Sequence, residues 1–241
     1  MPIQRQLRGG QPIRAVLFDL DNTLYDRDLA FETWARNFIA EHFTSESETQ
    51  RADVLAQIVI LDDKGYRPKT AMFADFKALY PTLPYDTEAL CSLFYEQWTD
   101  YMILDSETMR LLDALDKAGI PFGIVTNGSV QQNLKIDRLG LRKRTDCIFI
   151  SEVFGSRKPE AAIFHAAASA LNFACEDILF IGDNPHLDIC GAHAVGMTTA
   201  WLHRGADWPA NITDAQPDFS LDSLANVLTI LPSAQGRSRH K

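Results

Sequence analysis

Short apolar runs recur along this chain and are separated by polar or amphipathic stretches. Residues 13–18 are almost continuously apolar, which is typical of a strand buried on both faces. Comparable runs occur at 121–128, 147–150 and 177–184, and weaker ones at 198–202 and 217–220. The pattern predicts about six short strands.

The segments between most of these runs have helical spacing of apolar residues. Helices are predicted over 106–119, 129–140 and 159–172. Ser106 is the expected N-cap of the first and Gly119 its C-terminal stop, while Pro159 is expected near the first turn of the last. Strands that alternate with helices pair in parallel through right-handed crossovers, so this part is predicted to be an α/β domain.

Residues 29–101 differ in character, because their apolar positions follow helical spacing only. Four helical stretches (29–43, 52–63, 70–80 and 86–98) are separated in part by the turn-rich segments 65–69 and 80–86. We expect a bundle of about four helices. Arg67 and Lys69 are expected on its solvated surface. The expected core aromatic residues are Trp34, Phe38, Phe73, Phe76, Phe94 and Trp98.

The helical segment interrupts the α/β pattern directly after its first strand. The sequence therefore predicts a discontinuous α/β domain, 1–27 with 102–241, and an inserted helical domain, 28–101.

Composition excludes several functional classes. The 241 residues carry a formal net charge of −9, which argues against a nucleic-acid-binding surface. The four cysteines form no CxxC pair, so neither a zinc site nor a disulfide framework is expected. No apolar run could span a membrane, and residues 1–12 lack the apolar stretch of a signal peptide. We expect a cytoplasmic protein with no membrane partner.

Polar side chains with metal- and phosphate-binding chemistry follow the predicted strands. In an open parallel sheet such side chains meet at the carboxyl edge. Carboxylate oxygens suit Mg²⁺, and lysine and backbone amides suit phosphate oxygens. The set consists of Asp19, Asp21, Thr126, Asn127, Gly128, Lys158, Asp183 and Asp188.

Asp19 and Asp21 are one residue apart at the end of the first strand. Two carboxylates this close repel each other unless a cation neutralises them or they share protons unequally. Taken alone, the pair could also be an Asx-turn or a solvated strand end, but together with the other loops it indicates a charged site.

The four loops, in order, carry DxDxT, TNG, KP and GDxxxxD. Together they resemble the four signature motifs of the haloacid dehalogenase (HAD) superfamily. The helical insert resembles the C1 cap of subfamily I, and the whole arrangement is similar to the phosphatase branch. The resemblance implies a Rossmann-like, doubly wound parallel sheet with an inserted helical cap, and Mg²⁺-dependent hydrolysis of a small phosphomonoester.

The resemblance also implies roles for two aspartates. Asp19 would be the nucleophile that forms an aspartyl-phosphate. Asp21 would be the general acid for the leaving oxygen and then the base for water. Environment must push the pKa values of two such carboxyl groups apart, and we expect metal coordination to keep Asp19 ionised while Asp21 can hold a proton.

The remaining motif residues are implied to bind phosphate and metal. Thr126 and Lys158, with the amides around Asn127 and Gly128, would hold the phosphoryl oxygens. The metal would be bound by the carboxylates of Asp19 and Asp183 and by the backbone carbonyl of Asp21. Asp188 would lie in the outer shell and orient metal-bound water or Lys158, although a helix N-terminal acid is an alternative reading. His186, in the same loop, is not required by the motif.

Several alternatives remain open. A phosphomutase or a haloacid dehalogenase could use the same fold, but a dehalogenase lacks the second aspartate of the first motif, and Asp21 argues against it. A receiver-like signalling domain or a silent phosphate-binding protein is the alternative from a non-enzyme class. The insert does not reveal whether the substrate is a nucleotide, a sugar phosphate or a phosphoglycolate-like compound, and oligomeric state is not predicted.

Overall fold

A computed structural model of the protein describes residues 12–231. The expectation about a signal peptide rests on residues that lie almost entirely outside this range. The chain forms two compact units, one of residues 26–103 and the other of the remaining residues. The observed helical unit is two residues longer at each end than the segment expected from the sequence. Within residues 12–231, no helix combines the length and the apolar character needed to cross a membrane.

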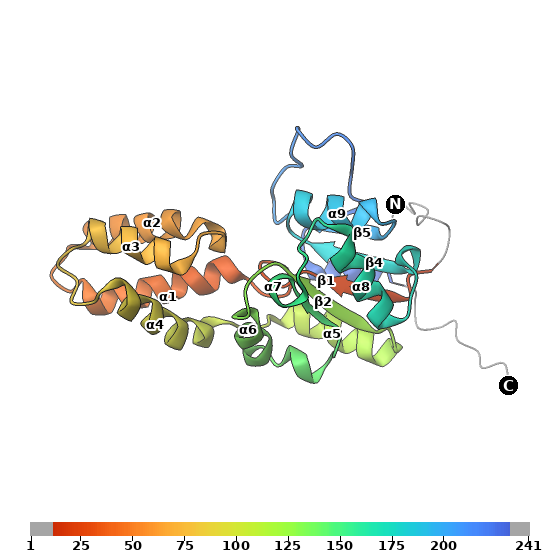
Figure 1. Ribbon diagram of the computed structural model, residues 1–241, viewed down its shortest axis with the longest axis horizontal. Coiled ribbons are helices and arrows are strands. Elements are labelled where there is room, and N and C mark those ends of the chain that lie inside the picture. Colours follow the sequence, from red (N-terminus) through yellow and green to blue (C-terminus); the bar gives the residue numbers. More distant parts are fainter. Residues whose placement is uncertain (1–11, 232–241) are drawn as a thin grey trace. The chain divides into compact units, whose positions relative to one another are not determined.

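The α/β unit is built on a six-stranded sheet in which every pair of neighbouring strands is parallel. The strand order is β3-β2-β1-β4-β5-β6, so β1 and β4 lie at the centre, where the order of connection reverses (Figure 1). This order confirms the doubly wound parallel sheet. The strands are β1 (Ala15–Phe18), β2 (Phe122–Thr126), β3 (Ile148–Ile150), β4 (Ile178–Gly182), β5 (Thr198–Leu202) and β6 (Phe219–Leu221).

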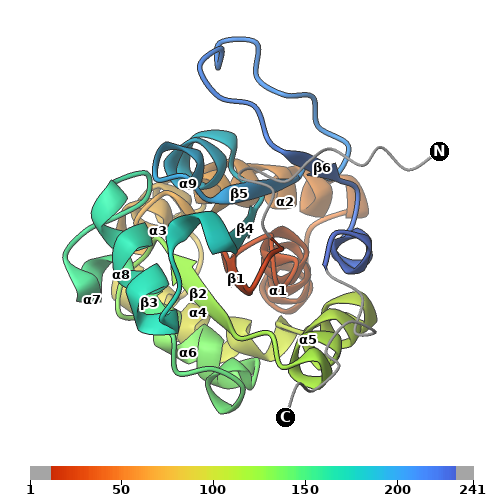
Figure 2. The same ribbon diagram turned by 90° about the vertical axis from the view of Figure 1, so that its right-hand side faces the viewer.

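Helices cover both faces of this sheet, with α8 and α9 on one side and α5 and α6 on the other (Figure 2). Side chains of a strand alternate between faces, so Ala15 and Leu17 of β1 join the buried cluster that includes Phe164 and Ala167 of α8. All four residues of β1 are fully buried, which explains its continuous apolar run. The helices are α5 (Ser106–Ala118), α6 (Gln132–Arg138), α7 (Ser151–Phe154), α8 (Ala161–Leu171) and α9 (Gly191–Ala194). Shorter helical turns are η4 (Leu141–Lys143), η5 (Cys175–Asp177), η6 (Pro185–Cys190) and η7 (Leu224–Thr229).

Two helix starts differ from the sequence expectation. The N-cap of α5 is Asp105 and not Ser106, because the Asp105 carboxylate accepts a hydrogen bond from the backbone N–H of Thr108 at 2.7 Å. Helix α8 begins at Ala161 after the N-cap Glu160, so Pro159 lies before the helix and not in its first turn. Gly119 ends α5 in the left-handed conformation, as predicted.

The helical unit contains four α-helices, joined and extended by two short 3₁₀ turns (Figure 1). The six aromatic residues expected in its core are buried. The ring of Trp34, for example, contacts the rings of Phe31, Phe38, Phe73 and Phe94. Aromatic packing therefore stabilises this unit. Its elements are α1 (Arg27–His42), α2 (Glu48–Asp62), η2 (Asp63–Gly65), α3 (Lys69–Leu79), α4 (Thr87–Gln97) and η3 (Trp98–Tyr101).

Lys69 does not lie on the solvated surface, contrary to expectation. Its ammonium donates to the buried carboxylate of Asp62 at 2.6 Å, and Arg27 donates to both oxygens of the same carboxylate. The Lys69 side chain is only 10 % exposed. The sequence pattern shows a lysine in a turn-rich stretch, but the buried carboxylate that attracts it lies at the end of the preceding α2.

Candidate active site

Asp19 directly follows β1 at the carboxyl edge of the sheet. Its backbone N–H donates to the carbonyl of Ile181 in β4, which fixes the residue between the two central strands. The side chain is buried, and Oδ1 accepts a hydrogen bond from Lys158 Nζ at 2.6 Å. A buried carboxylate paired with a buried ammonium is therefore held at the point where the strand order reverses.

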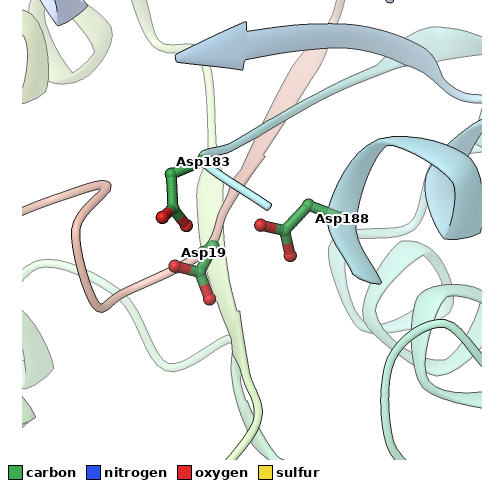
Figure 3. Close-up of side chains that lie close together, drawn as sticks. All are labelled: Asp19, Asp183 and Asp188. Carbon is green, nitrogen blue, oxygen red and sulfur yellow. The ribbon is translucent and has the colours of Figure 1, made fainter. Parts of the chain in front are cut away.

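Three carboxylates converge at this point. Asp19, Asp183 after β4 and Asp188 in η6 each offer an oxygen, and these oxygens all lie within 4.8 Å of one another (Figure 3). Lys158 Nζ also donates to Asp188 Oδ1 at 2.6 Å, so one lysine bridges two of the three acids. The structure thus brings together four residues from three distant parts of the sequence.

A glycine at the end of β4 makes room for Asp188. A Cβ atom on Gly182 would lie only 2.4 Å from Asp188 Oδ2, which is too close for any residue other than glycine at this position. The same oxygen, Oδ2, accepts a hydrogen bond from the backbone N–H of Asn184 at 2.9 Å. Asp188 is therefore fixed by its own loop and by Lys158, which accounts for its nearly complete burial.

The backbone of Asp183 is held by a residue that the sequence pattern did not single out. The indole N–H of Trp201, in β5, donates to the Asp183 carbonyl at 2.8 Å. Trp201 in turn packs edge-on against Trp208 at 5.1 Å between ring centroids. An aromatic residue at the end of the next strand thus fixes the loop that carries a proposed metal ligand.

Among the described hydrogen bonds, Lys158 supplies the positive charge that faces these three carboxylates, so their negative charge is only partly neutralised. Burial, only partly offset by Lys158, raises the pKa of Asp19 to about 7. Burial, together with the charges of Asp19 and Asp188, raises the pKa of Asp183 to about 8. A hard divalent cation would supply the missing charge, and an all-oxygen donor set of this size fits Mg²⁺.

Asp21 lies in different surroundings. Its carboxylate accepts hydrogen bonds from Lys135 Nζ at 2.7 and 2.8 Å, from Gln132 Nε2 at 2.7 Å and from the Tyr25 hydroxyl at 2.5 Å. Although burial acts in the opposite direction, the charge of Lys135 and these hydrogen bonds lower the pKa of Asp21 to about 2. Lys135, which the sequence analysis did not consider, thus favours the ionised form of Asp21. The expectation that a bound metal keeps Asp19 ionised stays a prediction.

The loop after β2 carries the predicted phosphate-binding residues. Thr126 is buried, and its hydroxyl oxygen accepts Gln132 Nε2 at 2.6 Å. The Asn127 side chain exchanges two hydrogen bonds of 2.9 Å with the backbone of Lys158, which ties this loop to the lysine. The backbone N–H of Gly128, one of the two amides predicted to bind phosphate, donates to Ser151 Oγ at 3.0 Å and so already has a partner.

Sequence reasoning missed Gln132, Lys135 and Tyr25, all of which contact Asp21. One signal was present, because an amide and a basic residue three positions apart share one face of the helix that follows TNG. His186, which was set aside, is exposed.

Comparison with known proteins agrees with this geometry. Residues 13–196 match the family model of the haloacid dehalogenase-like hydrolases. The chain is 29% identical to a glyceraldehyde 3-phosphate phosphatase of Methanopyrus kandleri, over 91% of this chain and 97% of that protein. It is 27% identical to a ribulose-1,5-bisphosphate 5-phosphatase of Halopiger xanaduensis, over 90% of this chain and 98% of that protein.

Among solved structures, the chain is similar to the HAD-type hydrolase YfnB of Bacillus subtilis, which was crystallised with magnesium. The TM-score is 0.67 at 23% identity, over 92% of this chain and 99% of that one, and this likeness concerns the fold. A family match over residues 13–196 covers most of the chain, from β1 to the end of α9, and includes all four motif loops. The chain therefore belongs to the haloacid dehalogenase-like hydrolases.

Proposed function

We propose that the protein is a Mg²⁺-dependent phosphatase that hydrolyses a small phosphomonoester through an aspartyl-phosphate on Asp19. The observation that carries the proposal is the group of Asp19, Asp183 and Asp188 around Lys158 at the carboxyl edge of the sheet. The names of the relatives support the reaction class, because both act on phosphorylated sugars.

Asp19 is the proposed nucleophile. A carboxylate oxygen of Asp19 bonds to phosphorus as the bond from phosphorus to the leaving oxygen breaks, and water later cleaves the aspartyl-phosphate to release inorganic phosphate. An anionic phosphate repels an attacking carboxylate, so positive charge is required beside the reacting atoms. Lys158, buried against Asp19, is placed to supply part of it.

Asp21 is the proposed proton carrier, first to the leaving oxygen and then from the attacking water. In the resting protein its surroundings favour the ionised form. The proton for the leaving oxygen is therefore proposed to arrive with the substrate, since a phosphomonoester monoanion carries one.

Asp19 and Asp183, with the backbone carbonyl of Asp21, are the proposed ligands of Mg²⁺, and Asp188 is proposed to act from the outer shell through Lys158. When bound, the cation neutralises charge on the phosphoryl group and on the surrounding carboxylates. The proposed donors to the phosphoryl oxygens are the Thr126 hydroxyl, the backbone N–H of Asn127 and Lys158. The backbone N–H of Gly128 could join them only if it gave up its hydrogen bond to Ser151 Oγ.

The helical unit is proposed to be a cap domain that selects the substrate. Phosphorylated sugars are the favoured substrate class because of the names of the relatives.

The phosphomutase and dehalogenase alternatives can be distinguished in the same assays. A mutase would transfer the phosphoryl group to a second sugar phosphate, and a dehalogenase would release halide.

The proposed function is tested by hydrolysis of p-nitrophenyl phosphate and a panel of sugar phosphates. We expect turnover that is abolished by EDTA and restored by added Mg²⁺, because the carboxylates need a cation to accept an anionic phosphate group. Undiminished turnover after exhaustive chelation would contradict the metal requirement. Halide release without phosphate release would contradict the reaction class.

The pH dependence of stability gives a second test of the cation site. A carboxyl group whose pKa is raised in the folded state contributes its full stabilisation at pH values below its unfolded-state pKa, which is near 4. This stabilisation is lost as the pH rises through the folded-state pKa. For Asp19 and Asp183 that window ends at pKa values of about 7 and 8. The lowered pKa of Asp21 adds no change there, because it acts below pH 4.

We therefore expect the Tm of the metal-free protein to fall by several degrees between pH 5 and pH 8.5, since about 1 kcal/mol corresponds to roughly 2–4 °C in a chain of this size. Mg²⁺ should raise the Tm more at pH 8 than at pH 5, because protons compete for the same oxygens. Asp183→Asn should flatten the metal-free profile and reduce the Mg²⁺ effect. Differential scanning calorimetry measures both, and a Mg²⁺ effect that is largest at pH 5 would refute this site.

A further inference from the structure

We propose that Lys135 and Gln132 of α6 are positioning residues, which hold the Asp21 carboxylate in place and direct the Thr126 hydroxyl toward the phosphoryl group. This inference rests on the proposed function and names residues outside the four sequence motifs. Gln132 and Lys135 lie 111 and 114 residues after Asp21 in the sequence, so only the tertiary structure brings them into contact with it.

The first step concerns the orientation of Asp21. Both carboxylate oxygens are occupied, Oδ1 by Tyr25 and Lys135 and Oδ2 by Gln132 and Lys135. Lys135 is the only one of the three donors that contacts both oxygens in the described hydrogen bonds. Since its side chain is only 13% exposed, the ammonium is held in a defined position. Lys135 thus restricts rotation of the carboxylate, and a proton carrier must be held in this way to reach its target.

The second step concerns charge. Asp19 and Asp21 each have a lysine of their own, because Lys158 pairs with Asp19 while Lys135 pairs with Asp21. The two lysines come from different elements, the loop before α8 and the helix α6. Separate partners keep two neighbouring carboxylates from competing for one cation, so each can be oriented for a different task.

The third step concerns Gln132. A carboxylate oxygen only accepts hydrogen bonds, so the amide of Gln132 must present its NH₂ group to Asp21. The same nitrogen lies 2.6 Å from Thr126 Oγ1, which therefore accepts its second N–H. The hydroxyl hydrogen of Thr126 is then directed away from Gln132, and the hydroxyl can donate to a phosphoryl oxygen.

Gly128 preserves this arrangement. A Cβ atom at this position would lie 2.7 Å from Gln132 Cγ, inside the space that the glutamine side chain occupies. The TNG loop and α6 are therefore fitted to each other around Gln132, whose side chain is almost completely buried.

The kinetic experiment compares Lys135→Met, Lys135→Arg and the matched control Lys143→Met, which alters an exposed lysine of the same unit. With a sugar phosphate, whose leaving oxygen needs a proton, Lys135→Met should lower kcat by about 10–100-fold with little change in KM. Lys135→Arg should recover most of the activity, and Lys143→Met should match the wild type. A Lys135→Met variant with wild-type kcat would overturn the role of Lys135.

Gln132→Met tests the hydroxyl of Thr126 separately, because it removes the amide without adding a charge beside Asp21. Without the donated N–H, nothing directs the hydroxyl hydrogen of Thr126 toward the phosphate. Inhibition by inorganic phosphate in the presence of Mg²⁺ should weaken by up to about tenfold, since a hydrogen bond to a charged group is weakened. Unchanged inhibition would overturn the role of Gln132.

Crystal structures of Lys135→Met and Lys143→Met separate this inference from the proposed function. We expect the Asp21 side chain in Lys135→Met to leave its position or to occupy more than one rotamer, with the fold unchanged. An unmoved Asp21 would overturn the positioning role. If the wild-type protein hydrolyses no phosphomonoester, the proposed function fails, while these structures still decide whether Lys135 positions Asp21.

Discussion

Asp19→Asn is expected to lower phosphatase activity by about 10⁴–10⁶-fold and to abolish the phosphoenzyme with every substrate. The amide cannot attack phosphorus, and a missing nucleophile typically costs that much. The fold should survive, because asparagine has nearly the same size and Lys158 retains Asp188 as a partner. Rapid quenching with radiolabelled substrate followed by peptide mapping measures the loss directly.

Asp21→Asn should fail in a different way. Its nucleophile is intact, and nitrophenolate is a weak base that barely needs a proton, so the first step with p-nitrophenyl phosphate should survive in part. The second step needs a base to activate water, and positioned acid–base groups contribute about 10²–10⁴-fold. We expect a burst of about one nitrophenolate per site, followed by a stall with phosphate on Asp19.

An exposed aspartate of the same unit provides the control for both variants. Asp207→Asn should leave turnover unchanged, because this side chain lies in an exposed part of the segment after β5. A radiolabel that maps to any residue other than Asp19 would contradict the assignment of the nucleophile. Wild-type turnover by Asp21→Asn would contradict the assignment of the proton carrier.

Lys158→Met is a third substitution with a large expected effect. Activity should fall by about 10²–10³-fold, the usual cost of removing one donor that stabilises charge in the transition state. Stability should also fall, by about 3–5 kcal/mol, because two buried carboxylates lose their common partner. Steady-state kinetics and urea denaturation at pH 7.5 measure the two effects.

A double variant separates catalysis from folding. Lys158→Met with Asp188→Asn removes one of the two unpaired charges, so much of the lost stability should return. Activity should stay low, since Asp19 still lacks its lysine. If the double variant regained activity together with stability, Lys158 would have a structural role and not the catalytic one proposed here.

Much of the α/β fold could be predicted from the hydrophobic pattern. The strand predicted at 198–202 coincides with β5 (Thr198–Leu202), and the other strands lie within or close to their predicted ranges. The reason is that each strand of a doubly covered parallel sheet is buried on both faces, which leaves a continuous apolar run. The exact ends of helices were less predictable, because Asp105 and Ser106 are both good caps and only the backbone geometry decides between them.

The positions of the motif residues followed from the same pattern. Asp19, Thr126 and Asp183 lie at the ends of β1, β2 and β4, which are neighbours in the sheet. Because parallel strands end at the same edge, a polar residue after each apolar run was sufficient to place them together. Lys158 and Asp188 followed from the motifs, and of the two partners expected for Asp188, metal-bound water or Lys158, the structure shows the contact with Lys158.

The sequence by itself determined the alternation of strands and helices, the helical insert and the set of acids and one lysine at the sheet edge. Tertiary structure alone decided which cation serves which carboxylate. Lys135 pairs with Asp21 from 114 residues away, and Lys69 joins Arg27 around Asp62 inside the helical unit. Hydrophobic periodicity records which face of an element is buried, whereas an ion pair depends on where two elements place their side chains in space. A local pattern contains no information about that distance.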